Sequence, residues 1–525
     1  MTLQKYSGTW DFSKASHLLR RTTYGPSLGE IHQVEGLGLD GALDLILSDI
    51  SLPDPPINID YEEDPYVPIG ATWINAPYTP QARMSGYRRR SIRAWMMERA
   101  FKKELNIREK MVLFWHNHFV VADIQDAKFL YRYINTIRKR ATGNIRELTK
   151  EITIDPAMLR YLNGNQNTGV EPNENYAREL LELFTVGKGA LAGSGDYTTF
   201  TEKDVVAMAR VLTGWRDVGF NSLTIGEISS AFRPNRHDTD SKDLSHRFNN
   251  VTIANEGDQE YKTLIDVIFQ SDHVANFIAR KLYRWFVYYE IDDTVETEII
   301  MPLSQIIRDN DYEIKPALRI LLESEHFMDD ERVGCMIKHP IDFLVSAFKS
   351  FDVPFPDSEF ESYRLQLGLF QFSALLQMEI FGIPSVAGWK AFYQSPAFYQ
   401  IWINSTTLPL RKVIVDALTV VGIEIRGSRR VKIDLFHIVD NLTDPFNPNN
   451  LINELASLMF PKPITDNQLT NIKNALIPGL PDFEWTEEYA LYRDNPDNEE
   501  IKKTVETRLI ILFNVMMNMP EYHLI

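Results

Sequence analysis

Hydrophobic side chains recur at the spacing of an α-helix along most of this chain. The segments with this pattern are 12–21, a segment that begins at Ser27, 83–121, 125–163, 173–186, 201–215, 261–348 and most of the C-terminal third. Local signals agree with them. Asp155-Pro156 is typical of a helix start, Gly187 of a helix end, and Thr201 with Asp204 resembles a capping box. We therefore predict a mainly α, multi-helical globular protein.

Other segments have no helical pattern and are rich in Pro, Gly, Asn, Ser or Asp. These are 51–70, 217–260, 382–400, 425–432, 443–450 and 475–498. We expect long irregular loops there, with at most minor β structure. Residues 431–439 (VKIDLFHIV) fit a strand, although LFHIVDNL also fits a helix.

The length of 525 residues exceeds the size at which a single hydrophobic core usually stops growing. We predict a helical domain at 1–350, which contains a polar segment at 108–242. A C-terminal helical region at 351–525 is expected to pack against it.

The amino-acid composition limits the kinds of molecule that this protein is expected to bind. The formal net charge is −17, from 55 basic and 72 acidic side chains. Such a surface repels nucleic-acid phosphates and anionic lipid, and it leaves room for cationic ligands or metal ions. The single cysteine, Cys335, excludes an intramolecular disulfide and a thiolate zinc finger, and is expected to fill core space.

The location is inferred from the absence of targeting signals. The chain starts without a basic stretch followed by an apolar run, and no apolar stretch reaches about 18 residues. We expect a cytoplasmic protein without a membrane span. An exported chain that has been trimmed to its mature form is the alternative.

Eight ordered blocks of sequence resemble one bacterial family. They are HLLRRTTYGP (17–26), REKMVLFWHNHF (108–119), NENYARELLELFTVG (173–187), YTTFTEKDVVAMARVLTGW (197–215), RHDTDSK (236–242), FIARKLYRWFV (277–287), MEIFGIPSVAGW (378–389) and WINSTTLPLR (402–411). The family is catalogued as domain of unknown function 1800. Its pattern has an apolar, Gly-rich run after the His-Asp-x-x-x-Lys element, where this chain reads DLSHRFNN. The resemblance implies no agreed reaction, so any activity must be inferred from the residues.

The first candidate site is the helix at 173–186. Asn175, Arg178, Glu179 and Glu182 share one stripe of a helix with 3.6 residues per turn. Two carboxylates one turn apart suit a shared cation or a coupled acid/base pair. The alternative is a solvated face or an Arg-Glu network between helices.

The second candidate is the pair His116 and His118. On a continuous helix these side chains point about 200° apart, so both could reach one metal only if the helix ends here. Otherwise, one is a hydrogen-bonded core residue and the other packs on Trp115.

The third candidate is His237-Asp238, with Lys242 and His246 nearby in an irregular segment. An adjacent His-Asp pair can supply metal ligands, or a base with the carboxylate that orients it. In the alternative, Asp238 is a turn residue and His237 is exposed.

Together, these elements favour a metal-dependent enzyme, a hydrolase before an oxidoreductase. His116, His118, His237 and Asp238 would be ligands of a divalent ion such as zinc, iron, manganese or calcium. Glu179, Glu182 and Arg178 would be the catalytic groups. Asn175, Lys242, Arg20 and Arg21 would bind a small-molecule or polymer substrate. The sequence contains no His-Glu-x-x-His, phosphate-binding Gly-rich loop, Rossmann fingerprint or Gly-x-Ser-x-Gly element.

A non-catalytic binding or scaffold protein is the alternative function. Its Arg-Glu network would be structural, and Arg20, Arg21, Arg88 to Arg90 and Arg93 would bridge helices. The aromatic residues of the C-terminal third would then face a protein partner or pack a core: Trp389, Phe392, Tyr393, Phe398, Tyr399 and Trp402.

Overall fold

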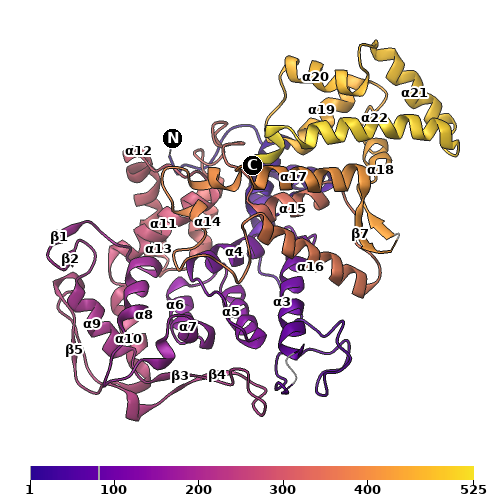
Figure 1. Ribbon diagram of the computed structural model, residues 1–525. Coiled ribbons are helices and arrows are strands. Elements are labelled where there is room, and N and C mark those ends of the chain that lie inside the picture. Colours follow the sequence, from indigo (N-terminus) through magenta and orange to yellow (C-terminus); the bar gives the residue numbers. More distant parts are fainter. Residues whose placement is uncertain (1, 81–82, 428) are drawn as a thin grey trace.

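The computed structural model describes residues 2–80, 83–427 and 429–525 as a mainly helical protein with small two-stranded sheets (Figure 1). The predicted fold class is confirmed. Every pair of strands is antiparallel and short, so helix packing rather than a sheet forms the body of the molecule.

The N-terminal helices follow the predicted boundaries closely. They are α1 (Phe12–Thr22), α2 (Leu28–Ile46), α3 (Arg83–Phe101), α4 (Arg108–His118), α5 (Ala127–Lys139), α6 (Ile145–Thr153), α7 (Pro156–Tyr161) and the 3-10 turn η1 (Gly164–Gln166). Ser27 starts α2 with a capping box to Glu30. The segment at 125–163 forms three helices, and α6 begins after its own N-cap, Asn144.

The middle of the chain alternates helices with the small sheets. Its elements are α8 (Glu174–Glu179), the π-helical η2 (Leu180–Phe184), β1 (Leu191–Gly193), β2 (Asp196–Tyr197), α9 (Glu202–Val211), β3 (Trp215–Val218), β4 (Ser229–Phe232), η3 (Pro234–Arg236), β5 (Lys242–Asp243), η4 (His246–Phe248), β6 (Thr252–Ile253) and η5 (Gly257–Gln259). The predicted capping box of Thr201 and Asp204 starts α9. The non-helical segment at 217–260 holds the second half of β3, together with β4 to β6.

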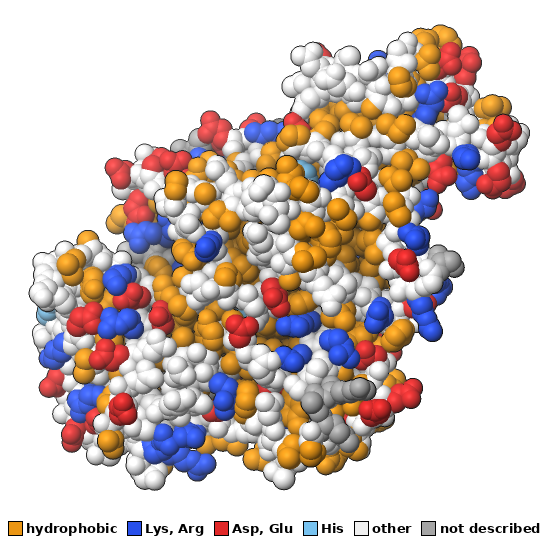
Figure 2. Space-filling view, viewed as in Figure 1, with side chains coloured by type: hydrophobic (Ala, Val, Ile, Leu, Met, Phe, Trp, Pro, Cys, Tyr) orange, Lys and Arg blue, Asp and Glu red, His pale blue; other side chains and the backbone are white. Residues whose placement is uncertain are grey.

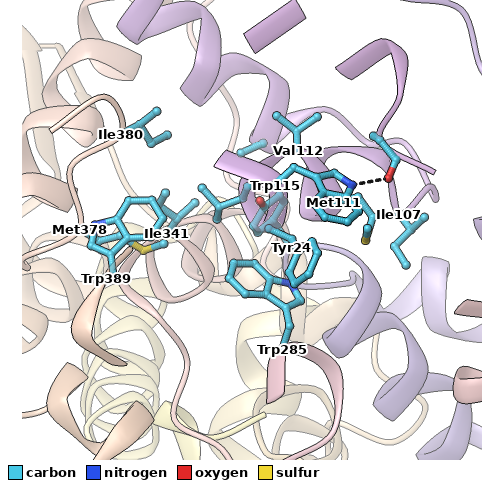
Figure 3. Packing of buried hydrophobic residues seen from close by; sticks show 14 of the residues in the cluster. Tyr24, Ile107, Met111, Val112, Trp115, Trp285, Ile341, Met378, Ile380 and Trp389 are labelled. Carbon is cyan, nitrogen blue, oxygen red and sulfur yellow. Dashed lines mark hydrogen bonds between the residues drawn. The ribbon is translucent and has the colours of Figure 1, made fainter. Parts of the chain in front are cut away.

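The next part of the chain is mainly helical, and two of its helices, α11 and α15, contribute side chains to the cluster around α4. They are α10 (Glu260–Ile268), α11 (Asp272–Phe286), α12 (Asp293–Val295), η6 (Glu296–Ile300), α13 (Met301–Asp309), α14 (Ile314–Glu323) and α15 (Pro340–Lys349). Figure 3 shows Trp285 of α11 and Ile341 of α15 in one cluster with Trp115 of α4.

The C-terminal third is mainly helical, and its described strands form one hairpin. Its elements are α16 (Glu359–Leu375), η7 (Lys390–Phe392), η8 (Phe398–Trp402), α17 (Thr407–Asp416), η9 (Ala417–Val421), β7 (Ile423–Arg426), β8 (Arg429–Val431), α18 (Leu435–Asp440), α19 (Pro448–Met459), α20 (Asp466–Leu476), α21 (Asp482–Asp494), α22 (Glu499–Met517) and η10 (Pro520–His523). Of residues 431–439 only Val431 belongs to β8, whereas Leu435–Asp440 form α18, so the helix reading of this segment is the correct one.

One predicted loop is wrong. Residues 475–498 were expected to be irregular, but 482–494 form α21. Its buried residues, Trp485, Tyr489 and Tyr492, are spaced at i, i+4 and i+7, so aromatic side chains alone make its helical stripe.

Helices α19 to α22 form a lobe at the upper right of Figure 1, whereas α16 packs along α3 in the main body. Met378, Ile380 and Trp389 reach the α4 cluster as well (Figure 3). Residues after 350 therefore contact the elements before it, and the division into two regions at residue 350 stays a prediction. None of the described helices is long and apolar enough to cross a membrane.

Candidate functional site

The helix that carries the two candidate glutamates changes its winding between them. It begins at the N-cap Asn173 as α8 and continues from Leu180 to Phe184 as a π-helical turn. Such turns add a residue to a helical turn and occur frequently at functional sites. Gly187 follows the turn, with a backbone φ of +74° and an N–H that donates to Leu181 O at 2.9 Å.

Arg178 links this helix to α9. Its guanidinium donates to both carboxylate oxygens of Glu202, at 2.9 and 2.8 Å, and to Glu174 at 3.2 Å. Glu182 lies 3.8 Å from Arg178 and 3.0 Å from the Nζ of Lys188. These contacts match the Arg-Glu network that the sequence left as an alternative for this stripe.

Glu179 differs from its neighbours on the stripe. It is half-buried, and within the described chain it accepts no hydrogen bond. Burial, and then the charge of Glu182, raise the pKa of its carboxyl above the ordinary value. Burial also raises the pKa of Tyr161, and Asp123 and Glu179 add to that rise. Asn175 donates to Leu162 O at 3.3 Å, so its amide holds the end of α7.

His116 is fully buried, and both of its ring nitrogens have partners. Nδ1 lies 2.9 Å from the hydroxyl of Tyr133, which donates its proton to Phe119 O at 2.5 Å. The N–H of Phe381 donates to Nε2 at 3.1 Å. This network places the ring proton on Nδ1 and leaves a neutral imidazole. Burial lowers the pKa of His116 to about 3.

His118 lies inside an aromatic cluster and holds the end of the π turn. Its Nε2 lies 3.0 Å from Phe184 O, which can only accept, so Nε2 carries the proton. Its Nδ1 has no hydrogen-bond partner in the described residues. Burial, and then the charge of Lys281, lower the pKa of this ring well below its usual value.

His237 and Lys242 meet at a residue that the sequence reading did not single out, Glu260. The Nε2 of His237 lies 2.8 Å from Glu260 Oε1, and the Nζ of Lys242 lies 2.8 Å from Oε2. The side chains of the three residues are almost completely buried. Thr213 holds the other ring nitrogen of His237 at 3.0 Å.

Asp238 turns away from this group. It pairs with Arg210 of α9, at 2.6 and 3.0 Å between guanidinium and carboxylate. The adjacent His237 and Asp238 therefore serve two different contacts, a buried one with Glu260 and a partly buried one with Arg210. Desolvation opposes the charge of Asp238, but Arg210 and the Asp240 N–H outweigh it and lower its pKa.

Arg20 and Arg21 are buried. Arg20 donates to Leu458 O at 2.6 Å and also reaches the carbonyls of Met459 and Phe460, at the C-terminal end of α19. A cation there compensates the helix dipole. Arg21 donates to Arg332 O at 2.8 Å and contacts the partly buried Cys335.

The other arginine and aromatic candidates are also largely internal. Arg88 is buried against Asp64 at 2.9 Å, and Arg93 lies 3.2 Å from Glu379. Trp389 and Trp402 are buried, whereas Tyr393 is exposed.

The candidate ligands do not meet. Within residues 2–80, 83–427 and 429–525, no three His, Cys, Asp or Glu side chains are grouped so that they could hold one metal ion. His116 contacts α5 and Phe381, His118 contacts the π turn, and His237 contacts Glu260.

Open cavities of about 750, 600 and 490 Å³ are lined by residues other than the predicted metal ligands, catalytic groups and substrate-binding residues, although Arg90, one of the arginine candidates, lines the cavity of about 600 Å³. The cavity of about 490 Å³ is lined by Asp155, whose burial raises its pKa to about 7. Arg132 lies 3.9 Å from its carboxylate. The Asp-Pro pair marked a helix start in the sequence, but nothing in it indicated a buried acid beside a cavity.

The residues that sequence reasoning missed are mostly partners that lie far along the chain. Glu260 follows His237 by 23 residues, and Phe381 follows His116 by 265 residues. Glu260 had one signal, since it is an acidic residue directly before the helical segment predicted from residue 261, and it is the first residue of α10.

Comparison with known proteins identifies the family and nothing more specific. No curated protein and no solved structure matches the chain. A family model described as "Protein of unknown function (DUF1800)" matches residues 17–524, nearly the full length. The predicted resemblance is thereby confirmed, and the chain belongs to the DUF1800 family.

Proposed function

We propose that this chain is a non-catalytic helical binding protein whose polar elements stabilise the fold. The observation that carries the proposal is that the candidate polar side chains form their hydrogen bonds and ion pairs with other parts of the same chain. His116, His237 and Lys242 each have their polar atoms engaged by other parts of the chain. A ligand or substrate could reach them only by displacing those contacts.

The buried group of His237, Lys242 and Glu260 gives the sharpest test. Glu260→Gln removes the carboxylate that faces the imidazole ring of His237 and the ammonium group of Lys242. Breaking a buried charge pair costs about 3–5 kcal/mol because the remaining charge is left uncompensated. We expect a loss of this size in urea-induced unfolding, with Glu174→Gln as the control. Glu174 forms an exposed pair with Arg178, which is worth less than about 1 kcal/mol.

The change in the free energy of unfolding caused by Glu260→Gln distinguishes a structural role of this residue from a catalytic one. Residues held in place for catalysis are often neutral or destabilising to the fold, so their replacement leaves stability unchanged or raises it. A Glu260→Gln variant as stable as the wild type would contradict the proposal.

A metal-dependent hydrolase is the second candidate, and Glu179 is the observation that favours it. Its carboxyl, which has no hydrogen-bond partner in the described chain, could bind a metal ion or act as a general base, and it lies beside a π turn. In this reading, zinc, iron, manganese or calcium would stabilise the chelator-treated protein by about 2.7 kcal/mol at a hundredfold excess over Kd. Glu179→Gln would abolish that gain. The binding-protein proposal expects no gain with any of the four ions.

A further inference from the structure

An open groove of about 600 Å³ runs between α16 and the α17–β7 segment. This volume is in the range of small-molecule sites, about 300–1,000 Å³. Its lining is mainly apolar: Leu365, Leu369 and Phe372 from α16, Ile414 from α17, and Ile423 and Ile425 from β7. No residue of the predicted polar site lines it.

The groove exists partly because α16 has a glycine, Gly368, in its wall. A Cβ built at Gly368 meets no atom within 4 Å, so any larger side chain there would project into open space. Glycine in the middle of a helix is unfavourable, and packing of α16 does not require it here. The missing side chain leaves room in the groove.

Apolar side chains continue from the groove onto the surface. Val413 and Val421 lie four residues before and after Ala417, which lines the groove, and they are 53% and 57% exposed. Leu375, on the same helix as Phe372, is 59% exposed. Figure 2 shows hydrophobic side chains gathered on the face where Figure 1 places α16, α17 and β7.

Basic side chains lie at the mouth of this apolar surface. Arg364 is exposed and has no ion pair in the described part of the chain, and Arg90 pairs only with Asp60, at 3.5 Å. The one acid in the lining, Glu424, faces Arg430 at 3.5 Å. An otherwise acidic protein therefore presents a free guanidinium next to an apolar groove.

We propose that the groove binds the acyl chain of a free long-chain fatty acid, with Arg364 and Arg90 facing the carboxylate. The inference rests on the proposed function as a binding protein and names its ligand class. An apolar lining provides the affinity for the chain, and guanidinium groups are the favoured partners of carboxylates. An anionic bilayer would face the whole surface of net charge −17, whereas a single molecule meets the local field of the two arginines.

The test is titration of the full chain with cis-parinaric acid, a fluorescent fatty acid, below its micelle concentration. We expect saturable binding at one site per chain. In competition, each loss of two methylenes from a saturated fatty acid should weaken binding roughly tenfold.

Gly368→Leu is the decisive variant because it fills the groove without harming the helix. It should weaken binding by at least about tenfold while the thermal unfolding temperature stays the same or rises. Gly36→Leu is the matched control. It adds the same side chain at another exposed glycine in a helix, in α2, where a built Cβ also meets nothing within 4 Å. It should bind like the wild type.

Arg364→Glu tests the carboxylate. It should weaken binding of hexadecanoate about fivefold or more and leave binding of hexadecanol unchanged.

The proposal is overturned if the wild type does not bind the probe, or if Gly368→Leu binds as well as the wild type. It is also overturned if binding is seen only with phosphatidylglycerol vesicles. Each of these outcomes leaves the stability test of Glu260→Gln and the metal titration unaffected, so failure of this ligand is distinguishable from failure of the proposed function.

Discussion

At the scale of single residues, the hydrogen-bond partners of the buried histidines decide what those rings can do. A neutral imidazole has one donor and one acceptor nitrogen. In His116, Tyr133 takes the donor and the N–H of Phe381 fills the acceptor, so the ring has no free position. The sequence could identify the histidines, but their partners lie on other elements, and no spacing rule predicts them.

Asp155 leads to a prediction about pH. Its side chain is 1% exposed, and burial raises its pKa from 3.8 to about 7. The folded state therefore holds a proton that the unfolded state releases, and stability falls as pH rises from about 4 to 7. One pKa unit is worth about 1.4 kcal/mol, so the loss is at most roughly 4 kcal/mol.

Asp155→Asn should remove that loss. Asparagine also caps helices, so the start of α7 is retained. We expect the variant to gain stability over the wild type as pH rises from 5 to 8, in urea unfolding at each pH. A difference between the two proteins that does not change with pH would rule out a raised pKa at Asp155.

At the scale of elements, the helix predicted at 173–186 is present at 174–184, but its π turn was not predicted. Four groups satisfy the carbonyls of that turn: His118, Lys281, the hydroxyl of Thr185 and the N–H of Gly187. Two of these groups, His118 and Lys281, lie far from the turn in sequence, so the local sequence does not contain this part of its support. The α21 helix was missed for a related reason, since aromatic residues in an acidic segment form its buried stripe.

Gly187 should be among the least replaceable residues of this element. Its φ of +74° disfavours any side chain, and an added Cβ would lie 2.8 Å from the ring of Phe277. We expect Gly187→Ala to destabilise the fold by roughly 2–4 kcal/mol, about 1 from the backbone and the rest from the clash.

Gly427→Ala separates the two contributions. Gly427 also has a positive φ, +59°, but its added Cβ meets nothing within 4 Å. Its cost in thermal or urea unfolding should be about 1 kcal/mol. Equal losses at the two glycines would show that the ring of Phe277 moves aside.

At the scale of the whole molecule, the mainly α class and the family could be predicted, because helix periodicity and ordered sequence blocks extend along the chain. Whether the candidate site residues lie together in space could not be predicted. His116, Glu179 and His237 are close enough in sequence to suggest one site, yet each packs in its own surroundings.

Acid sensitivity is a property of the whole core. Burial lowers the pKa values of His116, His326 and His523 to about 3, 4 and 3. Unfolded histidines take up protons below about pH 6.5, so stability present above that pH is lost as pH falls toward 4. Three such histidines lower the free energy of unfolding by up to about 4 kcal/mol for each pH unit of acidification. Asp155, whose raised pKa acts in the opposite direction, offsets roughly a third of that loss.

The slope of the unfolding free energy between pH 6.5 and 4.5 checks this. His326→Gln should have a shallower slope, and the exposed His246→Gln the slope of the wild type. A flat profile in the wild type would mean that these rings are protonated in the folded state.

The contact between His116 and Phe381 has a consequence for synthesis on the ribosome. Translation at about 5–20 residues per second leaves α4 exposed for tens of seconds before residue 381 is made, since 265 residues separate the two partners. During that time, Met378, Ile380 and Trp389 cannot cover the apolar side chains around Trp115 (Figure 3). The nascent chain therefore exposes an apolar surface that is prone to aggregation. We expect the yield of folded protein to depend on chaperones that bind this surface before the chain is released.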